Sequence, residues 1–582
     1  MSLILLIFFS TISKPLFHNK KVINIQKKFE IVERKFSKFY PYSYLKENYF
    51  PFKRKEIKVK ESKKQSDTVK FNILAIRVAF QKEEPDDSFT TGNGWFDLSI
   101  KGNPDSVPFF SEPPHDKKYF ETYLESLKAF LISVGYGRIK IKKYVVKPDK
   151  NDSFYVLPYP MRYYGDPEHF EEGLVKLLVD ALHLADQDET INFMDIDNNG
   201  IKDYKEGIRD IYIIFHAGST WQSDFGDTPY DIATVTIPQG ALEYYTGEKY
   251  IILNGGVDTV VSGILLPEQP SQDGIEVELQ GFLFHEFPHD AFYATDLYGV
   301  NGLSSGVGTW CLMGTGGWNE VGAENLNGDI ESVFGAIPSF PSAWMRMWFD
   351  YAIMVTPKRF FEPEEWLRET IDPLWGFSIY KGMVDTFVPY LEEREFSIYE
   401  ATEPSQDTVN YLPDSVRFPK IIFIPIDEYE YYLLEYRNDL LFGSNELKGF
   451  FKNGALISPY GAWDFLLPGS GLLVWHIDER VVIEHYWEVN SYPPYKGVDL
   501  VEADGIQDFD KWTEGSETFY GSEYDAFFKG FKDNFSYKTF PSSKAKSGGN
   551  TFIEIKDISE RRKHKMNFKL LNTFLKLHIK DY

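Results

Sequence analysis

Alternating apolar and polar stretches in the first half of the chain predict a sheet covered by helices. Residues 69–80, 138–146 and 209–218 are strand-like, and VKFNILAIRVAF at 69–80 is apolar enough for a central strand. Residues 115–137 and 170–187 carry apolar side chains at helical spacing. Because strands and helices alternate along the chain, we expect an α/β layer here.

The pattern changes after about residue 375. Several short β-like segments follow one another, with Gly, Pro, Asn and Asp clustered between them. This spacing is typical of an all-β, sandwich-type domain. The strand-like segments are 420–437, 471–479, 550–559 and 565–572.

The N-terminal region differs from the rest in both pattern and charge. The run MSLILLIFFSTIS is too short to span a bilayer and resembles the apolar core of a signal peptide. Residues 1–70 contain 17 Lys and Arg but only 6 Asp and Glu, a net charge of +11, whereas the whole chain carries -25. We predict a signal peptide over 1–16, a basic propeptide over 17–67 and therefore a secreted protein. A solvated basic tail is the alternative reading of the charged segment.

The predicted fold class is α+β. We expect an α/β domain over 68–360, followed by a C-terminal β domain over 361–582. The acidic charge argues against nucleic acid as a partner, because phosphate binding needs a basic face. No later apolar run is long enough for a membrane span, and the single cysteine, Cys311, excludes an intrachain disulfide.

A possible metal site lies in residues 277–293, which are expected to be helical. The motif His285-Glu286-Phe-Pro-His289 places two imidazoles four residues apart, on one face of a helix, where they can bind Zn²⁺. Glu286 can reach a zinc-activated water from the side and accept its proton. An ordinary amphipathic helix with two hydrogen-bonded histidines is the alternative.

A second possible metal site has the spacing of a calcium loop. Residues 195–206, DIDNNGIKDYKE, place oxygen ligands at alternate positions around Gly200 and end in an acidic twelfth position. A solvated acidic turn is the alternative. Because a helix precedes this loop and a strand follows it, we interpret the site as structural bracing. The candidate calcium ligands are Asp195, Asp197, Asn199, the Ile201 carbonyl, Asp203 and Glu206.

These motifs occur in an order that resembles the immune inhibitor A-type metallopeptidases, which are secreted zinc endopeptidases of the metzincin clan. The resemblance covers nearly all of residues 68–571 and includes PMRYYG, IIFHAG, DLYG, VGTWCLMGTGGW, LPGSGLLVWHIDE and GVDLVEADG. It implies a metzincin-like catalytic domain, protein or peptide substrates and a leader that keeps the enzyme latent. By this resemblance His285, His289 and Asp296 are zinc ligands, Glu286 is the catalytic base, and Met313 forms an apolar floor below the metal.

Two features depart from the family pattern. Pro288 stands where the family has glycine, and it removes a hydrogen bond to the Phe284 carbonyl at a cost of about 3 kcal/mol if it lies in the helix interior. The segment AFYAT replaces a glycine-containing bend before Asp296. If that bend displaces Asp296 from the metal, another acid would be the third ligand. If the site is inactive, the alternative function is that of a metallopeptidase-like extracellular binding protein. The alternative acids are Asp290, Glu320 and Glu324.

Three further features have two readings each. His216 ends a strand and either donates to a substrate oxyanion or is simply hydrogen-bonded there. The acids of VEADGIQDFD either bind a second calcium or form an acidic turn; they are Glu502, Asp504 and Asp508. His476 is expected to pack or hydrogen-bond within the β domain.

Overall fold

The computed structural model describes twelve stretches of the chain. The predicted signal peptide (1–16) and the boundary between residues 360 and 361 lie outside them, and the predicted propeptide is described only at 20–39. The described residues are 20–39, 68–100, 112–324, 330–355, 383–387, 393–402, 419–427, 429–439, 451–458, 462–510, 520–561 and 564–572.

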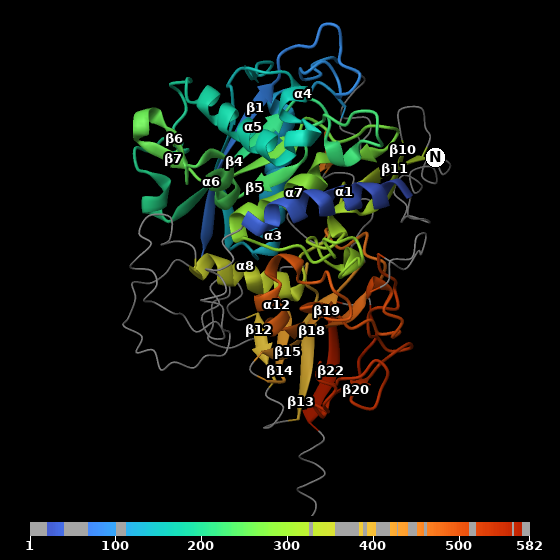
Figure 1. Cartoon of the computed structure of the whole chain (residues 1–582). Helices are drawn as coiled ribbons and strands as arrows, with labels where there is room; N and C mark the ends of the chain where they lie inside the picture. The colour runs from blue at the N-terminus through green and yellow to red at the C-terminus, as the bar shows by residue number, and fades with distance from the viewer. Residues whose placement is uncertain are drawn as a thin grey trace, which may run out of the picture.

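The first half is built on a six-stranded sheet in the order β2-β1-β4-β8-β5, with β3 also paired to β1 (Figure 1). β1 is parallel to β2, β3 and β4, and β4 is parallel to β8, whereas β5 runs antiparallel to β8 at the sheet edge. The three strands predicted from the sequence are confirmed. The strands are β1 (Val69–Ala79), β2 (Ile139–Lys147), β3 (Tyr155–Val156), β4 (Ile208–His216), β5 (Val235–Ile237) and β8 (Gly263–Pro267).

Helices pack on this sheet where the apolar spacing predicts them. α3 (Lys117–Val134) begins at Asp116, whose side chain accepts a hydrogen bond from the Tyr119 amide, and it ends at Gly135. α5 (Phe170–Ala185) and α7 (Leu279–Phe292) are the other predicted helices, and both are confirmed. The remaining elements of this half are α4 (Met161–Tyr164), α6 (Gln239–Thr246), β6 (Ile251–Leu253), β7 (Asp258–Val260), β9 (Glu276–Val277), β10 (Glu320–Glu324), β11 (Ile330–Phe334) and α8 (Ala343–Val355).

The second half is dominated by two further sheets, so the chain is α+β. A five-stranded sheet, β12-β14-β15-β18-β19, and a four-stranded sheet, β13-β22-β21-β20, bury a common apolar cluster. All four predicted strand segments contain strands. The elements are β12 (Val384–Thr386), β13 (Arg394–Tyr399), β14 (Ile421–Pro425), β15 (Glu430–Arg437), β16 (Phe451–Lys452), β17 (Ala455–Leu456), β18 (Gly471–Asp478), α12 (Glu479–Glu484), β19 (Val498–Leu500), β20 (Phe535–Ser536), β21 (Ile553–Lys556) and β22 (Lys565–Asn572).

The two halves share one continuous core, because the other face of the five-stranded sheet packs against the first half. Arg437 of β15 is fully buried at this junction and forms an ion pair with Asp464. Its guanidinium also donates to the Trp310 carbonyl at 2.8 Å and to the Phe340 carbonyl at 3.0 Å. The β domain is thus held against the turn that leads to Met313.

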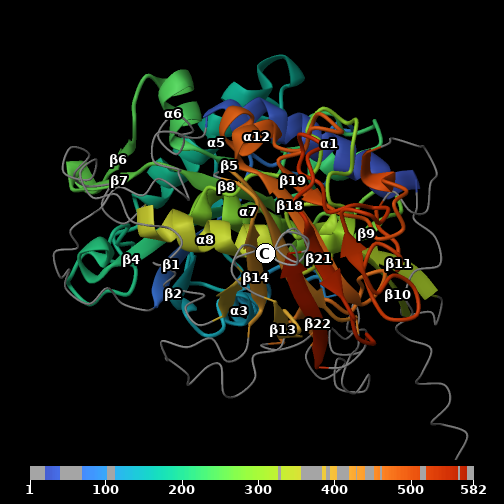
Figure 2. The ribbon, with the colours of Figure 1, turned by 90° about the horizontal axis from the view of Figure 1, so that it is seen from below.

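A helix that the sequence interpretation did not find lies in the basic leader. α1 (Lys20–Phe36) buries Ile25, Phe29, Val32 and Phe36, a stripe at helical spacing. In Figure 1 it is the blue helix at mid-height, between the blue-green upper half and the orange-red lower half, and Figure 2 shows it from below. None of the helices described is long and apolar enough to cross a membrane.

Candidate metal centre

The two histidines of the motif lie side by side on α7. Their Nε2 atoms are 3.4 Å apart, and both side chains are buried. Pro288 lies inside this helix, which begins at Leu279 and still continues to Phe292. The proline therefore removes a helical hydrogen bond without separating the imidazoles.

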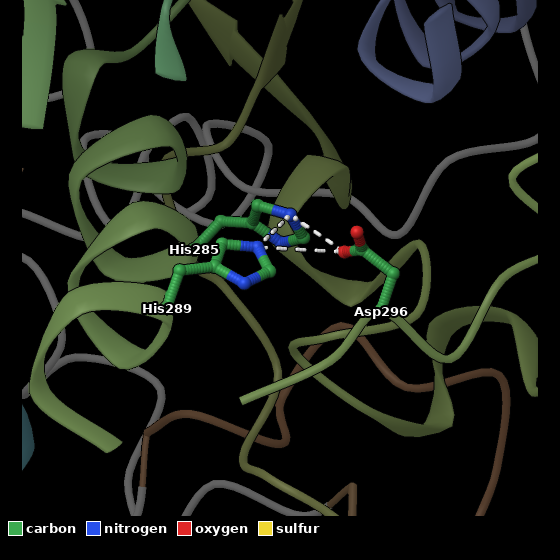
Figure 3. Close-up of side chains that lie close together, drawn as sticks. All are labelled: His285, His289 and Asp296. Carbon is green, nitrogen blue, oxygen red and sulfur yellow. Dashed lines mark hydrogen bonds and ion pairs between the residues drawn. The ribbon is translucent and has the colours of Figure 1, made fainter. Parts of the chain in front are cut away.

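Asp296 completes the group (Figure 3). Its Oδ1 atom lies 3.2 Å from His285 Nε2 and 3.5 Å from His289 Nε2. The chain turns back after α7 because Tyr293 adopts a left-handed conformation with φ of 49°. The altered bend thus brings Asp296 to the histidines although it contains no glycine.

The spacing of these three ligand atoms fits a tetrahedral zinc ion. Bonds of about 2.0–2.1 Å at tetrahedral angles place neighbouring ligand atoms about 3.3–3.4 Å apart. The Nδ1 atoms of His285 and His289 face the carbonyls of Leu312 (3.3 Å) and Ala294 (2.8 Å). Each Nδ1–H can therefore donate to a carbonyl, which leaves Nε2 free to bind a metal. The buried Oδ1 of Asp296 faces both imidazole nitrogens and pairs with them when they are protonated.

The other acids considered as third ligands point elsewhere or are not described. Asp290 interacts with Ser262, and Ser332 donates to Glu320. The side chain of Glu324 lies outside the described residues. Of the described acids considered as the third ligand, Asp296 is the one that lies beside the two histidines.

Glu286 is held by the edge strand of the sheet. The Thr236 hydroxyl of β5 donates to Glu286 Oε2 at 2.9 Å, while Oε1 is buried without a hydrogen-bond partner in the described structure. Burial raises the pKa of Glu286, although His289 and His285 oppose this shift. One oxygen of the carboxylate is thus fixed and the other is free to take a proton.

The turn that carries Met313 runs beside the site. The Met313 carbonyl accepts a hydrogen bond from the amide of Leu297, which follows Asp296, at 2.6 Å. The carbonyl of the preceding residue, Leu312, faces His285 at 3.3 Å. Met313 itself is fully buried. Its role as the floor of the site stays a prediction.

Glu33 of α1 also reaches the site, and the sequence interpretation missed it. This side chain is 1% exposed, and a ligand atom of Glu33 lies within 4.8 Å of those of Glu286 and His289. Burial raises the pKa of Glu33 well above its usual range, with Glu286 and Asp296 adding to the shift. Burial lowers the pKa of His289, but the surrounding acids, Glu33 first, outweigh it and raise the pKa to about 10. Glu33 and Glu286 thus lie close to His289, and Asp296 lies close to both imidazoles.

Tyr298 is a second residue that the sequence interpretation missed. Its ring stacks on His285 with centroids 6.1 Å apart, and its buried hydroxyl has no hydrogen-bond partner among the described residues. Burial, followed by the charge of Asp296, raises the pKa of Tyr298 well above its usual range. The hydroxyl therefore keeps its proton and can act as a donor.

The predicted calcium loop brings only part of its ligand set together. Oxygens of Asp195, Asp197 and Asp203 lie within 4.8 Å of one another, and Asp203 is fully buried with Oδ1 lacking a hydrogen-bond partner in the described structure. Gly200 has φ of 85°, as a calcium loop requires at its turn. The loop connects α5 to β4, as predicted.

The other three positions of the loop make contacts of their own. Asn199 Nδ2 donates to Glu206 at 2.7 Å, and the Ile201 amide donates to Asn199 Oδ1 at 2.8 Å. The Lys142 ammonium of β2 lies 2.6 Å from Asp197 and 3.6 Å from Glu206. The twelfth position therefore faces a lysine, and a bound cation would compete with it.

Neither His216 nor His476 belongs to a group of possible metal ligands in the described part of the chain. His216 is fully buried, with Nδ1 3.0 Å from the Ala217 carbonyl. His476 Nε2 pairs with Glu430 at 2.7 Å within the β domain, which confirms the sequence interpretation.

Of the acids proposed for a second calcium, two converge. Glu502 and Asp504 are grouped with Asp525, whereas Asp508 is not a member of this group. The Asp508 amide instead donates to Glu502 Oε2 at 2.6 Å.

A scan of the chain against protein-family models finds no match, and a search of curated proteins finds none either. What the protein does must therefore follow from the chemistry of its own site.

Proposed function

We propose that this chain is a secreted zinc-dependent metalloendopeptidase that hydrolyses peptide bonds of protein or peptide substrates. The observation that carries the proposal is the convergence of His285, His289 and Asp296, whose ligand atoms are 3.2–3.5 Å apart. Glu286 lies on the same helix, beside these ligands. The arrangement agrees with the resemblance to immune inhibitor A-type enzymes and with the metzincin-like catalytic domain which that resemblance implies.

The three ligands would hold zinc, which when bound supplies Lewis acidity toward water and the scissile carbonyl. Glu286 accepts the proton of the attacking water on its free Oε1 and passes it to the leaving nitrogen. Thr236 keeps the other carboxylate oxygen in place. The Tyr298 hydroxyl is available to donate to the carbonyl oxygen as negative charge develops there.

The substrate surface in this proposal is the edge of the six-stranded sheet. β5 pairs with β8 on one side and is the last strand of the sheet. An extended peptide can add to such an edge through main-chain hydrogen bonds. Thr236 of β5 contacts Glu286, so a peptide on this edge would pass directly by the catalytic base.

The 195–206 loop is proposed as a structural calcium site. Asp195, Asp197 and Asp203 already converge there, and oxygen ligands are those that Ca²⁺ prefers. The ion would brace the connection between α5 and β4, since the loop joins these two elements.

The test uses the full chain with a cleavage site for an unrelated, specific protease inserted between residues 40 and 67. We expect the cut protein to bind one zinc and to degrade casein, and we expect a chelator or Glu286→Gln to abolish degradation. Casein cleavage that survives both treatments would overturn the proposal. One bound zinc without any turnover would instead support an inactive metallopeptidase-like binding protein.

A further inference from the structure

Three acids of the C-terminal half form a compact cluster that the zinc site does not use. Glu502 and Asp504 follow β19, and Asp525 comes from a later segment. One carboxylate oxygen of each lies within 4.8 Å of one oxygen of the other two. Backbone hydrogen bonds hold the two segments side by side, since the Ala503 amide donates to the Asp525 carbonyl at 2.9 Å and the Asp504 amide donates to the Tyr524 carbonyl at 3.1 Å. The backbone thus brings these carboxylates together.

Two of the three acids are buried although all three are ionised at their ordinary pKa. Glu502 is 3% exposed and Asp525 is 1% exposed. Glu502 Oε2 accepts a hydrogen bond from the Asp508 amide at 2.6 Å, whereas Oε1 is buried without a hydrogen-bond partner in the described structure. A buried carboxylate oxygen without a partner costs free energy, and a bound cation would remove that cost.

The protein supplies little positive charge to balance this cluster. Within the described residues, no salt bridge joins the three acids to a lysine or an arginine. The Lys496 ammonium lies in the same region, but it pairs with Asp499 at 2.8 Å and with Asp510 at 2.7 Å. Burial raises the pKa of Glu502 to about 9, although Lys496 opposes this shift, and burial raises the pKa of Asp525 to about 7. The cluster therefore lacks a cation that matches its charge.

Asp525 connects the cluster to the turn that leads to Met313. The indole of Trp310 is fully buried and donates to Asp525 Oδ2 at 2.7 Å. Close by, the Thr309 amide donates to the Tyr520 carbonyl at 2.8 Å. A cation held by Asp525 would therefore fasten the β domain to this turn.

We propose that Glu502, Asp504 and Asp525 bind a calcium ion, in addition to the zinc site and the 195–206 loop. All three donors are carboxylate oxygens, which Ca²⁺ prefers, whereas structural zinc sites are built from Cys and His. Oxygens bound to one Ca²⁺ at about 2.3–2.6 Å lie at most about 5 Å apart, and the cluster falls within this limit. Backbone carbonyls or water would fill the remaining coordination positions.

The experiment counts the calcium ions bound to the full chain by equilibrium dialysis. Asp203→Ala removes the ion proposed for the 195–206 loop, and we expect this variant to retain one calcium. Glu502→Gln, added to Asp203→Ala, keeps the shape of the side chain but removes a charge, and it should weaken calcium binding by at least about tenfold. Asp508→Asn, added to Asp203→Ala, is the matched control, because Asp508 lies in the same loop but outside the cluster. It should leave calcium binding unchanged.

A second measurement reports the position of the ion. Tb³⁺ replaces Ca²⁺ in oxygen-ligand sites and emits light when a nearby tryptophan absorbs. Because the Trp310 indole donates to Asp525, Asp203→Ala should give tryptophan-sensitised emission that excess calcium abolishes. Adding Asp525→Asn should lower this emission, even if the variant with Glu502→Gln folds poorly, and adding Asp508→Asn should not.

The outcomes separate this inference from the proposed function. If Asp203→Ala binds no calcium, or if adding Glu502→Gln changes its affinity no more than adding Asp508→Asn does, the site is refuted. Zinc binding is measured separately on the same samples, so a failure of the calcium site leaves the proposed function intact. A wild type that binds calcium but no zinc would refute the proposed function alone.

Discussion

Removing the hydrogen bond between Thr236 and Glu286 tests whether the edge strand orients the catalytic base. The Thr236 hydroxyl lies 2.9 Å from Glu286 Oε2 and 3.1 Å from the Glu286 carbonyl, in a fully buried environment. Thr236→Val keeps the shape of the side chain but removes the donor. A hydrogen bond to a charged group is worth about 1.5–3 kcal/mol, and about 1.4 kcal/mol corresponds to a factor of ten. We therefore expect kcat/KM of the cut protein to fall roughly 10- to 150-fold.

The assay is peptide or casein cleavage at fixed zinc, with zinc affinity measured in parallel. Zinc affinity should not change, because no hydrogen bond joins Thr236 to the three ligands in the described structure. Thr236→Ser is the matched control, since it keeps the hydroxyl and should retain most of the activity. Full activity of Thr236→Val, or an equal loss in both variants, would refute the role assigned to this hydroxyl.

Three further predictions concern stability. Pro288→Ala restores an amide opposite the Phe284 carbonyl and should raise the free energy of unfolding by about 1 kcal/mol. Removing the proline from the helix interior gains about 3 kcal/mol, whereas the smaller side chain loses roughly 1.6 kcal/mol of apolar burial and the more flexible unfolded chain costs about 0.5 kcal/mol. A lower stability of the variant in denaturant would contradict this prediction. Asp203→Ala should reduce the rise in melting temperature that calcium gives the wild type, and an unchanged calcium response would remove the loop as a site. Arg437→Met leaves Asp464 buried without its cation and should cost about 3–5 kcal/mol. Adding Asp464→Leu should recover only part of this loss, because the Trp310 and Phe340 carbonyls still lack the donor that Arg437 supplies. No recovery in the double variant would show that the loss has another cause.

Elements that depend on local spacing were predictable from the sequence. α3 follows from its apolar stripe and from the Asp116 cap, and β1 follows from a long apolar run. The two facing sheets of the second half follow from short strands between turn residues. In these segments the local preference and the tertiary packing agree, so the pattern alone was sufficient.

The leader shows why the rest was not predictable. α1 has an apolar stripe at helical spacing, but its buried face also includes Glu30 and Glu33. Glu33 is buried close to His289, and the sequence of the leader alone does not show that these two residues approach each other.

The site was predictable in its residue types but not in its geometry. His285, Glu286 and His289 follow from their spacing on a helix, and Asp296 came only from the family resemblance. Asp296 reaches the histidines because Tyr293 adopts a left-handed conformation. No residue of AFYAT has a preference that predicts this conformation. The calcium loop has the right spacing, but the pairing of Lys142 with Asp197 comes from a neighbouring strand.

The most direct test of the account is anomalous diffraction at the zinc edge from crystals of the zinc-loaded full chain. We predict one strong zinc peak bonded to His285 Nε2, His289 Nε2 and Asp296 Oδ1 at about 2.0–2.2 Å. A map with no peak between these atoms, or with zinc held by other residues, would contradict it.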